Sequence, residues 1–587
     1  MRLLRRPLAV AVATALLGLP LPVHAAERVR VEVEGLDRDL RTQVLATLSL
    51  QEARGDDDLT EERIRRLHTR SEEEINLALQ PFGYYRPSVQ GTLERDGDTW
   101  VARYTVDPGP PLEVTNRDLQ VRGEGADDPE LREVVQDFPV VQGERLYHPD
   151  YEEGKAALTE YAAANGYLDA AFETNEIRVD LDRYTADVVL HFDTGPRYLF
   201  GPVVFHQNFL DPDLLRGYVT FEPGTPIDTN ELLRLQNSLS DSPYFQRVEV
   251  VPRQEGREGL QVPIDVNLTA SRPQRWSTGI GYGTDTGARG TLGLELRRIN
   301  RRGHRGQSEA RLSEIEQSFQ ANYQIPGPYP RTDVLTFSLG YARFEPEVSK
   351  SDSALIGVGL TQARGSWREG FSLNFQRDEF TIGLDEGTAE MLLPQASWSK
   401  VSADDRIYTT SGKRYQFDFR AADESVLSSV SFLQARAQAK VITSFADRFR
   451  LISRAEVGYT ETDQFRELPP TIRFFAGGDQ SVRGFSYQEL GDLDEAGNVI
   501  GGETLMAGGV EVEYRFLEQW LFLEKWGVAA FYDTGGASSS FGSNLEQGAG
   551  LGLRWLSPIG PIRADAAWAI SEPGTPVRFH LTIGPDL

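Results

Sequence analysis

The side chains that most often carry out catalysis are scarce in this chain or lack the spacing that catalysis needs. The chain contains no cysteine, which excludes disulfides, thiolate zinc sites, iron–sulfur clusters and cysteine nucleophiles. None of its seven histidines forms an HxH or HExxH spacing, and no serine lies in the GxSxG elbow of a hydrolase. We therefore expect no enzymatic activity, no metal and no cofactor.

A second kind of chemistry, charge-assisted binding, is possible at Val482-Arg483-Gly484-Phe485, which lies in a long stretch between two strand-like segments. The guanidinium of Arg483 presents a rigid fork of donors that suits carboxylates placed to accept in pairs. Gly484 permits a tight turn or a close approach to a wall, and Phe485 offers an apolar anchor. The alternative is an ordinary surface turn whose arginine is solvated.

Length and composition limit the class of protein that could hold such a site. The chain has 587 residues, enough for several domains, and 40% of them are hydrophobic, which excludes a largely disordered chain. Its 61 Lys and Arg face 88 Asp and Glu, a formal net charge of −27. Nucleic acid is therefore not an expected partner, because binding to a phosphate backbone depends on clustered basic residues.

The first residues have the pattern of a targeting segment. Arg2, Arg5 and Arg6 precede an apolar run over 8–17, and small residues allow cleavage after Ala25. We expect residues 1–25 to be a signal peptide and the mature protein to be exported; an uncleaved membrane anchor is the alternative. Past residue 26 no stretch approaches the roughly 18 consecutive apolar residues that a spanning helix needs. Any membrane residence would therefore use the strands of a closed barrel.

The first half of the chain repeats one pattern three times. Tyr84, Tyr167 and Tyr244 recur at intervals of about 80 residues, each where a helical stretch gives way to a strand. The pattern predicts units at 27–108, 109–195 and 196–272, each with a strand, two helices and two strands. We expect the tyrosines to pack in the cores of these units. This β-α-α-β-β order, repeated behind a signal sequence, resembles the POTRA domain, which implies that partners or clients bind by adding a strand to a sheet edge.

The second half alternates apolar and polar residues in segments of about ten residues, which indicates strands with one apolar face. Leu433, Ala435 and Ala437, for example, alternate with Gln434 and Arg436. There are sixteen candidate strands, an even number as is typical of bacterial barrels, and several of them are long enough to cross a bilayer at a tilt. The fold class expected is thus α+β POTRA-like repeats followed by an all-β 16-stranded transmembrane barrel at 273–587, with a soluble β-sandwich as the alternative. The predicted strands are 275–284, 288–299, 306–315, 317–325, 333–345, 353–364, 367–380, 391–401, 413–421, 430–442, 447–460, 503–516, 526–534, 547–556, 562–570 and 577–583.

The longest interruption of this pattern, at 461–502, carries a specific resemblance. Its Val482-Arg483-Gly484-Phe485 is similar to the VRGF/VRGY tip of the long sixth extracellular loop in the BamA/TamA superfamily of outer-membrane assembly factors. The segments 531–535 (FYDTG) and 553–563 (LRWLSPIGPIR) resemble two further motifs of that superfamily and follow in the right order. Three POTRA-like units rather than five, and the chain's last residues, resemble its TamA branch most closely.

The resemblance implies roles for particular residues. The loop 461–502 is expected to fold into the barrel, where Glu513 and Asp533, on the lumen faces of their strands, would hold Arg483. It also implies a lateral seam between the first and last strands through which client strands enter the bilayer. The last predicted strand is short and runs into a proline, which has no amide to donate, so its pairing should open easily. The residues assigned to the seam are Trp276, Gly279, Gly281, Gly283, Val577, Phe579, Leu581, Ile583, Gly584 and Pro585.

The resemblance also implies a function and partners. The expected function is assembly of autotransporters and other barrel proteins in the outer membrane of a Gram-negative bacterium, with the POTRA-like units in the periplasm. Expected partners are client outer-membrane proteins, outer-membrane lipid and a TamB-like protein, anchored in the inner membrane and spanning the periplasm, at the first unit. The alternatives are a two-partner-secretion pore, a BamA-like general insertase and an outer-membrane lipase. Two-partner pores usually carry two POTRA domains and a plug helix.

Overall fold

The computed structural model describes residues 27–56, 58–285, 287–405, 408–446, 448–516, 525–557 and 560–583. The expected signal peptide lies outside these residues, and so do Gly584 and Pro585 of the expected seam. The chain forms two compact units. The first runs to residue 201 and includes 223–230 and 257–262, and the second holds 202–222, 231–256 and 263–587. None of the helices within the described ranges is long and apolar enough to cross a membrane.

The first of three small sheets has the strand order β1-β3-β2, with β1 parallel and β2 antiparallel to β3. Helix α3 packs on it because its apolar residues recur at helical spacing, and Ile64 and Ile75 are fully buried. Thr60 caps that helix by accepting the N–H of Arg63, and Asp37 caps α1 by accepting that of Leu40. The elements are β1 (Arg28–Glu34), α1 (Arg38–Thr47), α2 (Ser49–Glu52), η1 (Ala53–Gly55), α3 (Glu61–Leu79), η2 (Gln80–Phe82), β2 (Ser88–Asp96) and β3 (Thr99–Asp107).

The second sheet repeats this topology in the order β4-β6-β5. Asp128 caps α4 by accepting the N–H groups of Glu130 and Leu131, and its other oxygen accepts the hydroxyl of Tyr167 at 2.9 Å. That tyrosine is 3% exposed and follows a helix that ends before Gly166, whose φ is +88°. The elements are β4 (Glu113–Arg122), η3 (Glu124–Asp127), α4 (Pro129–Gln136), α5 (His148–Ala164), β5 (Ala171–Asp180) and β6 (Thr185–Asp193).

The third sheet has the order β7-β9-β8. The apolar face of α7 is buried at Leu232, Leu235 and Leu239. Tyr244 donates its hydroxyl hydrogen to the carbonyl of Gly303, in the turn between the second and third barrel strands, at 2.5 Å. The recurring tyrosine of this unit therefore connects it to the barrel. The elements are β7 (Leu199–His206), α6 (Pro212–Arg216), α7 (Thr229–Ser240), β8 (Phe245–Pro252), η4 (Gln254–Gly256) and β9 (Gln261–Ala270).

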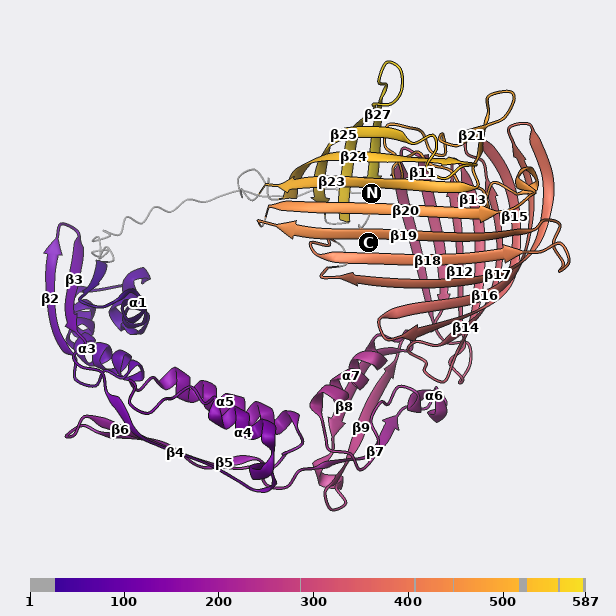
Figure 1. Ribbon diagram of the computed structural model, residues 1–587. Coiled ribbons are helices and arrows are strands. Elements are labelled where there is room, and N and C mark those ends of the chain that lie inside the picture. Colours follow the sequence, from indigo (N-terminus) through magenta and orange to yellow (C-terminus); the bar gives the residue numbers. More distant parts are fainter. Residues whose placement is uncertain are drawn as a thin grey trace, which may run out of the picture. The chain divides into compact units, whose positions relative to one another are not determined.

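The second half of the chain forms a single antiparallel sheet of sixteen strands in sequence order, which curls into a barrel (Figure 1). The expected fold class is thereby confirmed, and the soluble sandwich alternative was wrong. The strands are β10 (Gln274–Gly283), β11 (Gly287–Leu296), β12 (Arg305–Ser313), β13 (Glu316–Pro326), β14 (Val334–Phe344), β15 (Ser349–Arg364), β16 (Trp367–Ile382), β17 (Asp385–Ala403), β18 (Gly412–Ala422), β19 (Phe432–Phe445), β20 (Phe449–Glu461), β23 (Thr504–Arg515), β24 (Trp526–Ser538), β25 (Glu546–Ser557), β26 (Gly560–Ala569) and β27 (Val577–Ile583).

Side-chain exposure follows the period of two that a membrane barrel requires. On β19, Leu433 is 59% exposed while its neighbour Gln434 is 3% exposed. Large apolar side chains cover the outer face of many strands, among them Leu339, Ile356 and Leu551. Exposed apolar side chains on so many strands suit contact with lipid better than contact with water.

The long connection between β20 and β23 is folded and packed. It contains η5 (Phe465–Glu467) and the small hairpin of β21 (Asp492–Leu493) and β22 (Val499–Gly501). Leu468 and Ile472 are fully buried in a core that they share with Met391 of β17. Arg473 ties the connection together by donating to the carbonyls of Leu468, at 2.8 Å, and Ile500, at 3.1 Å. We call residues 462–503 the lumen loop.

Candidate functional site

Arg483, at the tip of the lumen loop, is enclosed by carboxylates from three barrel strands. Its Nε and Nη2 donate to the two oxygens of Asp533 on β24, at 2.7 and 3.2 Å. Its Nη1 donates to Glu511 on β23 at 2.6 Å and to Asp565 on β26 at 3.1 Å. The guanidinium carbon lies 3.4 Å from the ring centroid of Phe531, so the fork is also held against an aromatic face.

Further arginines complete this cluster. Arg554 on β25 contacts Glu511 at 2.6 Å, Glu513 at 3.0 Å and Asp565 at 2.5 Å. On β20, Arg450 lies 3.2 Å from Glu513, and Arg454 lies 2.8 Å from Asp533. Four arginines thus face four carboxylates, so that the formal charges cancel. Burial of these ions is tolerable only because each has an opposite charge in contact. We call these eight residues the lumen charge cluster.

The register of adjacent strands positions the cluster, because it brings their lumen-facing residues to the same height along the barrel wall. Asp533 is paired across the ladder with Gly509, and Asp565 with Gly552. A β-carbon at either glycine would overlap the carboxylate of its partner, and one at Gly548 would overlap the carbonyl oxygen of Arg483. The absence of side chains at these positions therefore makes the space that the loop tip and the carboxylates occupy.

The structure corrects one predicted pairing. Arg483 was expected to bind Glu513 and Asp533, and it contacts Asp533, but Glu513 instead contacts Arg554 and Arg450. Glu511, two residues earlier and on the same face, takes the expected place. Alternation shows which face of a strand a residue lies on, but it does not show which residue of the neighbouring strand or loop lies opposite. It therefore could not distinguish these two glutamates.

Sequence reasoning missed Glu511, Arg554 and Asp565 as contacts of the loop tip. A signal was present for Asp565, which is flanked by Ala564 and Ala566 and is the single carboxylate of the predicted strand 562–570. Arg554 lies in the segment 553–563 that resembles a superfamily motif, and it alternates there with the apolar Leu553 and Trp555. The three glycines that make room for the cluster could not have been found without the ladder register.

The other residues of the loop motif pack against the wall near the end of the barrel. Val482 and Phe485 are at most 1% exposed and share a small core with Ala569 of β26. Gly484 has a φ of +104°, in the region that favours glycine, and a β-carbon there would press on the backbone of Trp568 and Ala569. The motif therefore meets the barrel through a turn that no larger residue would fit.

The first and last strands meet at a seam that differs from every other junction of the barrel. β10 pairs with β11 over its whole length, and β27 pairs with β26, but no ladder joins β10 to β27 within the part of the chain that the structure describes. Ile280 on β10 is 97% exposed and Phe579 on β27 is 75% exposed. The remaining described seam residues lie on these two strands as expected: Trp276, Gly279, Gly281, Gly283, Val577, Leu581 and Ile583.

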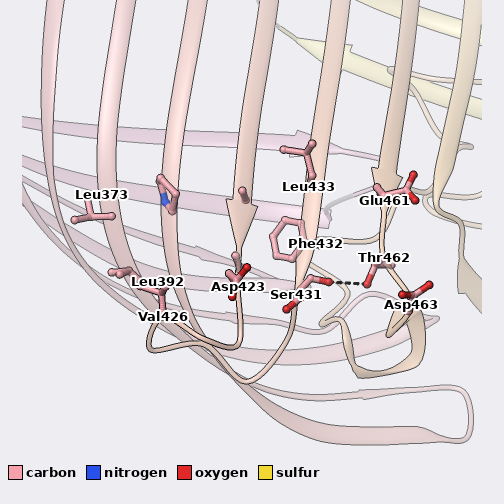
Figure 2. A pocket seen from close by; sticks show the side chains of 13 residues that line it. Leu373, Leu392, Asp423, Val426, Ser431, Phe432, Leu433, Glu461, Thr462 and Asp463 are labelled. Carbon is pink, nitrogen blue, oxygen red and sulfur yellow. Dashed lines mark hydrogen bonds between the residues drawn. The ribbon is translucent and has the colours of Figure 1, made fainter.

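A pocket of about 650 Å³ lies at the root of the lumen loop (Figure 2). Leucines of the strands, including Leu373, Leu392 and Leu433, line one part, and Asp423 and Asp463 of two connections line another. Thr462, the first residue of the lumen loop, donates its hydroxyl hydrogen to the carbonyl of Ser431 at 2.8 Å. The pocket thus marks where the loop leaves the wall.

A barrel with an unzipped seam and a loop docked in its lumen, preceded by POTRA-like sheets, defines a class of outer-membrane proteins. Comparison with known families agrees with this class: residues 298–586 match the Omp85 superfamily domain, and residues 30–108 match the family described as POTRA domain TamA domain 1. The barrel is thus an Omp85 superfamily domain, and the chain is an outer-membrane protein whose POTRA domains lie in the periplasm.

Two curated relatives are both outer membrane protein assembly factor BamA. That of Nitratidesulfovibrio vulgaris is 22% identical over 444 residues, 71% of this chain and 54% of the relative. That of Neisseria meningitidis serogroup B is 22% identical over 493 residues, 71% of this chain and 60% of the relative. The chain therefore spans little more than half the length of the curated relatives it matches. Among solved structures, BamA from Haemophilus ducreyi lacking POTRA domains 1–3 superposes with a TM-score of 0.68 at 15% identity, covering 81% of this chain and 99% of that one.

Proposed function

We propose that this protein is a non-enzymatic assembly factor that inserts β-barrel proteins, autotransporters among them, into the outer membrane through its β10–β27 seam. The observation that carries the proposal is the absence of a ladder between β10 and β27 among the described residues. Every backbone amide in hydrocarbon needs a partner, and a strand edge at the seam can supply partners to an incoming client strand. The homology to BamA supports the same reading.

The driving force in this proposal comes from the client. A client strand that pairs at the seam satisfies its backbone, and its apolar face becomes buried in lipid, which lowers its free energy without any nucleotide. The lumen charge cluster would keep the loop tip docked while the seam opens. Arg483, Glu511, Asp533 and Asp565 are in this view positioning residues, and none of them acts on a bond of the client.

We also propose that the segments 27–108, 109–195 and 196–272 are three POTRA domains that receive clients and partners. Each contains one three-stranded sheet with two edge strands that can accept an added strand. The match of residues 30–108 to a TamA-type POTRA domain supports a TamB-like partner at the first domain. A second candidate is a BamA-like general insertase, which the two curated relatives favour.

Co-purification distinguishes these two assignments. Affinity purification of the full chain from mildly solubilised membranes should recover a large inner-membrane-anchored protein, and deletion of residues 27–108 should abolish that recovery. Recovery of outer-membrane lipoproteins in its place would support the BamA-like assignment.

A covalent lock across the seam tests the proposed function itself. Leu581 donates its N–H to Oγ1 of Thr284 at 3.3 Å, so the two residues are neighbours at the seam, and a disulfide between cysteines at these positions would join β27 to the end of β10. The chain has no cysteine of its own, so the pair is unambiguous. Oxidised T284C/L581C should lose client insertion while the barrel stays folded, and reduction should restore it.

A matched control places the disulfide in a regular ladder. Leu339 and Ile356 are cross-strand partners on β14 and β15, and both face outward. The oxidised L339C/I356C protein should keep full insertion activity. Insertion by the oxidised seam variant at the rate of the reduced one would disprove the proposed gating.

A further inference from the structure

Asp479 of the lumen loop contacts both sides of the seam. Its carboxylate accepts the hydroxyl hydrogen of Thr284, at the end of β10, at 3.2 Å, and its backbone N–H donates to Asp285 Oδ2 at 2.8 Å. On the other side it is hydrogen-bonded to Nδ1 of His580 on β27. The side chains of Asp479 and His580 are 8% and 4% exposed. One carboxylate thus joins the first strand to the last.

The imidazole of His580 is held between two points of the same loop. Its Nε2 accepts the backbone N–H of Gly484 at 3.1 Å, so Nδ1 carries the hydrogen and donates it to Asp479. The loop therefore binds β27 through both nitrogens of one ring. A further ion pair, between Arg578 of β27 and Glu489 of the loop at 3.4 Å, adds to this attachment.

The direct contact across the seam depends on the same groups. Oγ1 of Thr284 accepts the N–H of Leu581 and donates its own hydrogen to Asp479, so the carboxylate orients the hydroxyl that bridges the two strands. Elsewhere in the barrel, neighbouring strands are joined by seven or more paired residues. Among the described residues of the seam, side-chain hydrogen bonds organised by the loop take the place of a ladder.

We propose that Asp479 and His580, with Thr284 and Asp285, form a clasp by which the lumen loop holds the seam closed. Contact of Asp479 with the two strands and closure of the seam are then one coupled event, while the tip at Arg483 stays docked, and release of Asp479 is the step that frees the strand edges. The inference rests on the proposed function for its biological meaning. Closure of the seam can be measured without any client, so the clasp and the proposed function can be disproved separately.

Oxygen and nitrogen atoms of Asp285, Asp479 and His580 lie within 4.8 Å of one another, the arrangement of a possible cation site. The hydrogen bonds to both nitrogens of His580 occupy the positions through which it would bind a metal. Arg454 also donates to the backbone carbonyls of Asp479 and Ser481, which places positive charge beside the group. We therefore assign the group as a hydrogen-bonded clasp and make a metal one outcome of the test.

The test measures the distance between the two strands in the full chain. Spin labels at I280C and F579C, which face outward and belong to no part of the clasp, report the seam by pulsed electron resonance in nanodiscs. The unaltered clasp should give a narrow distance distribution. D479A and H580A should each broaden it and add a component longer by about 5 Å, one strand spacing, and the double variant should add little more.

Two controls separate a clasp from general damage. D378A removes another fully buried lumen carboxylate, bonded to Gln376 on β16, and should leave the seam distance unchanged. In D479A the loop tip should stay resistant to protease, because the lumen charge cluster still holds Arg483. An unchanged seam distance in D479A, or broadening of the unaltered protein by a chelator, would overturn the clasp; the latter would assign a metal.

Discussion

Arg483 binds Asp533 through a two-point fork, with Nε 2.7 Å from Oδ2 and Nη2 3.2 Å from Oδ1. The backbone N–H of Arg483 also donates to Oδ2, at 3.3 Å. A single carboxylate on β24 therefore fixes both the side chain and the main chain of the loop tip. Such a geometry specifies position as well as contributing energy, because a fork tolerates little rotation.

Replacing Arg483 by alanine should release the loop tip. Removing one partner of a buried ion pair costs about 3–5 kcal/mol, and less where lumen water screens the remaining charges. A loss of about 3 kcal/mol would raise the undocked population by roughly a hundredfold. Limited proteolysis within 477–500 measures this directly. The control is R436A, which breaks the partly exposed pair with Glu456 and should leave the cleavage rate unchanged.

Glutamine substitutions distinguish the two glutamates of β23. E511Q weakens contacts to both Arg483 and Arg554, whereas E513Q leaves every contact of Arg483 in place. Hydrogen bonds to charged groups contribute about 1.5–3 kcal/mol each, so E511Q should increase cleavage of the loop roughly tenfold or more. E513Q should leave cleavage near that of the unaltered protein. Faster cleavage in E513Q than in E511Q would instead support the pairing of Arg483 with Glu513 that the sequence predicts.

A single methyl group at Gly548 would fill the space between the loop tip and the barrel wall. A β-carbon at Gly548 would overlap the carbonyl oxygen of Arg483, so G548A should push the tip away at a cost of about 1–3 kcal/mol. Gly290 is a matched control, because it also lies in a barrel strand and a β-carbon there would meet nothing within 4 Å. G290A should behave as the unaltered protein in loop proteolysis. Equal effects of the two substitutions would mean that strand propensity, and not the contact with the loop, is responsible.

The barrel could be predicted from sequence because its signal is local. A period of two marks a strand with one lipid-facing side, and all sixteen predicted segments overlap a strand of the structure. The largest differences occur at β15, which begins before its predicted start, at β24, which extends beyond its predicted end, and above all at β17, which begins at Asp385 where 391 was predicted. There Met391 and Leu393 point inward against Ile472 of the loop, so apolar residues no longer mark the outer face.

The candidate site was predictable only in part, for a physical reason. The sequence motif identified the loop tip, and alternation placed acidic residues in the lumen. The contacts themselves depend on how far each strand is shifted along its neighbour, and no single segment encodes that shift. The clasp at Asp479 and His580 was missed altogether, because two ordinary polar residues 101 positions apart carry no pattern.

The periplasmic half offers a prediction on pH. Tyr85 and Nε2 of His148 are hydrogen-bonded at 2.9 Å, between the first and second repeated units. Burial lowers the pKa of His148 below its ordinary value of 6.5, although Glu152 opposes the shift. Because the folded state holds the neutral imidazole, its contribution to stability is present above about pH 6.5. It is lost as the pH falls through the folded pKa.

Hydrogen exchange of the full chain, corrected for the intrinsic rate at each pH, should therefore show faster opening of 80–86 and 145–151 at pH 5.5 than at pH 7.5. H148Q keeps an acceptor for the Tyr85 hydroxyl and cannot be protonated, so it should remove most of this difference. Burial also lowers the pKa of His68, so a smaller pH dependence of exchange should remain within the first unit of H148Q. An undiminished pH dependence in H148Q would show that another group controls this junction.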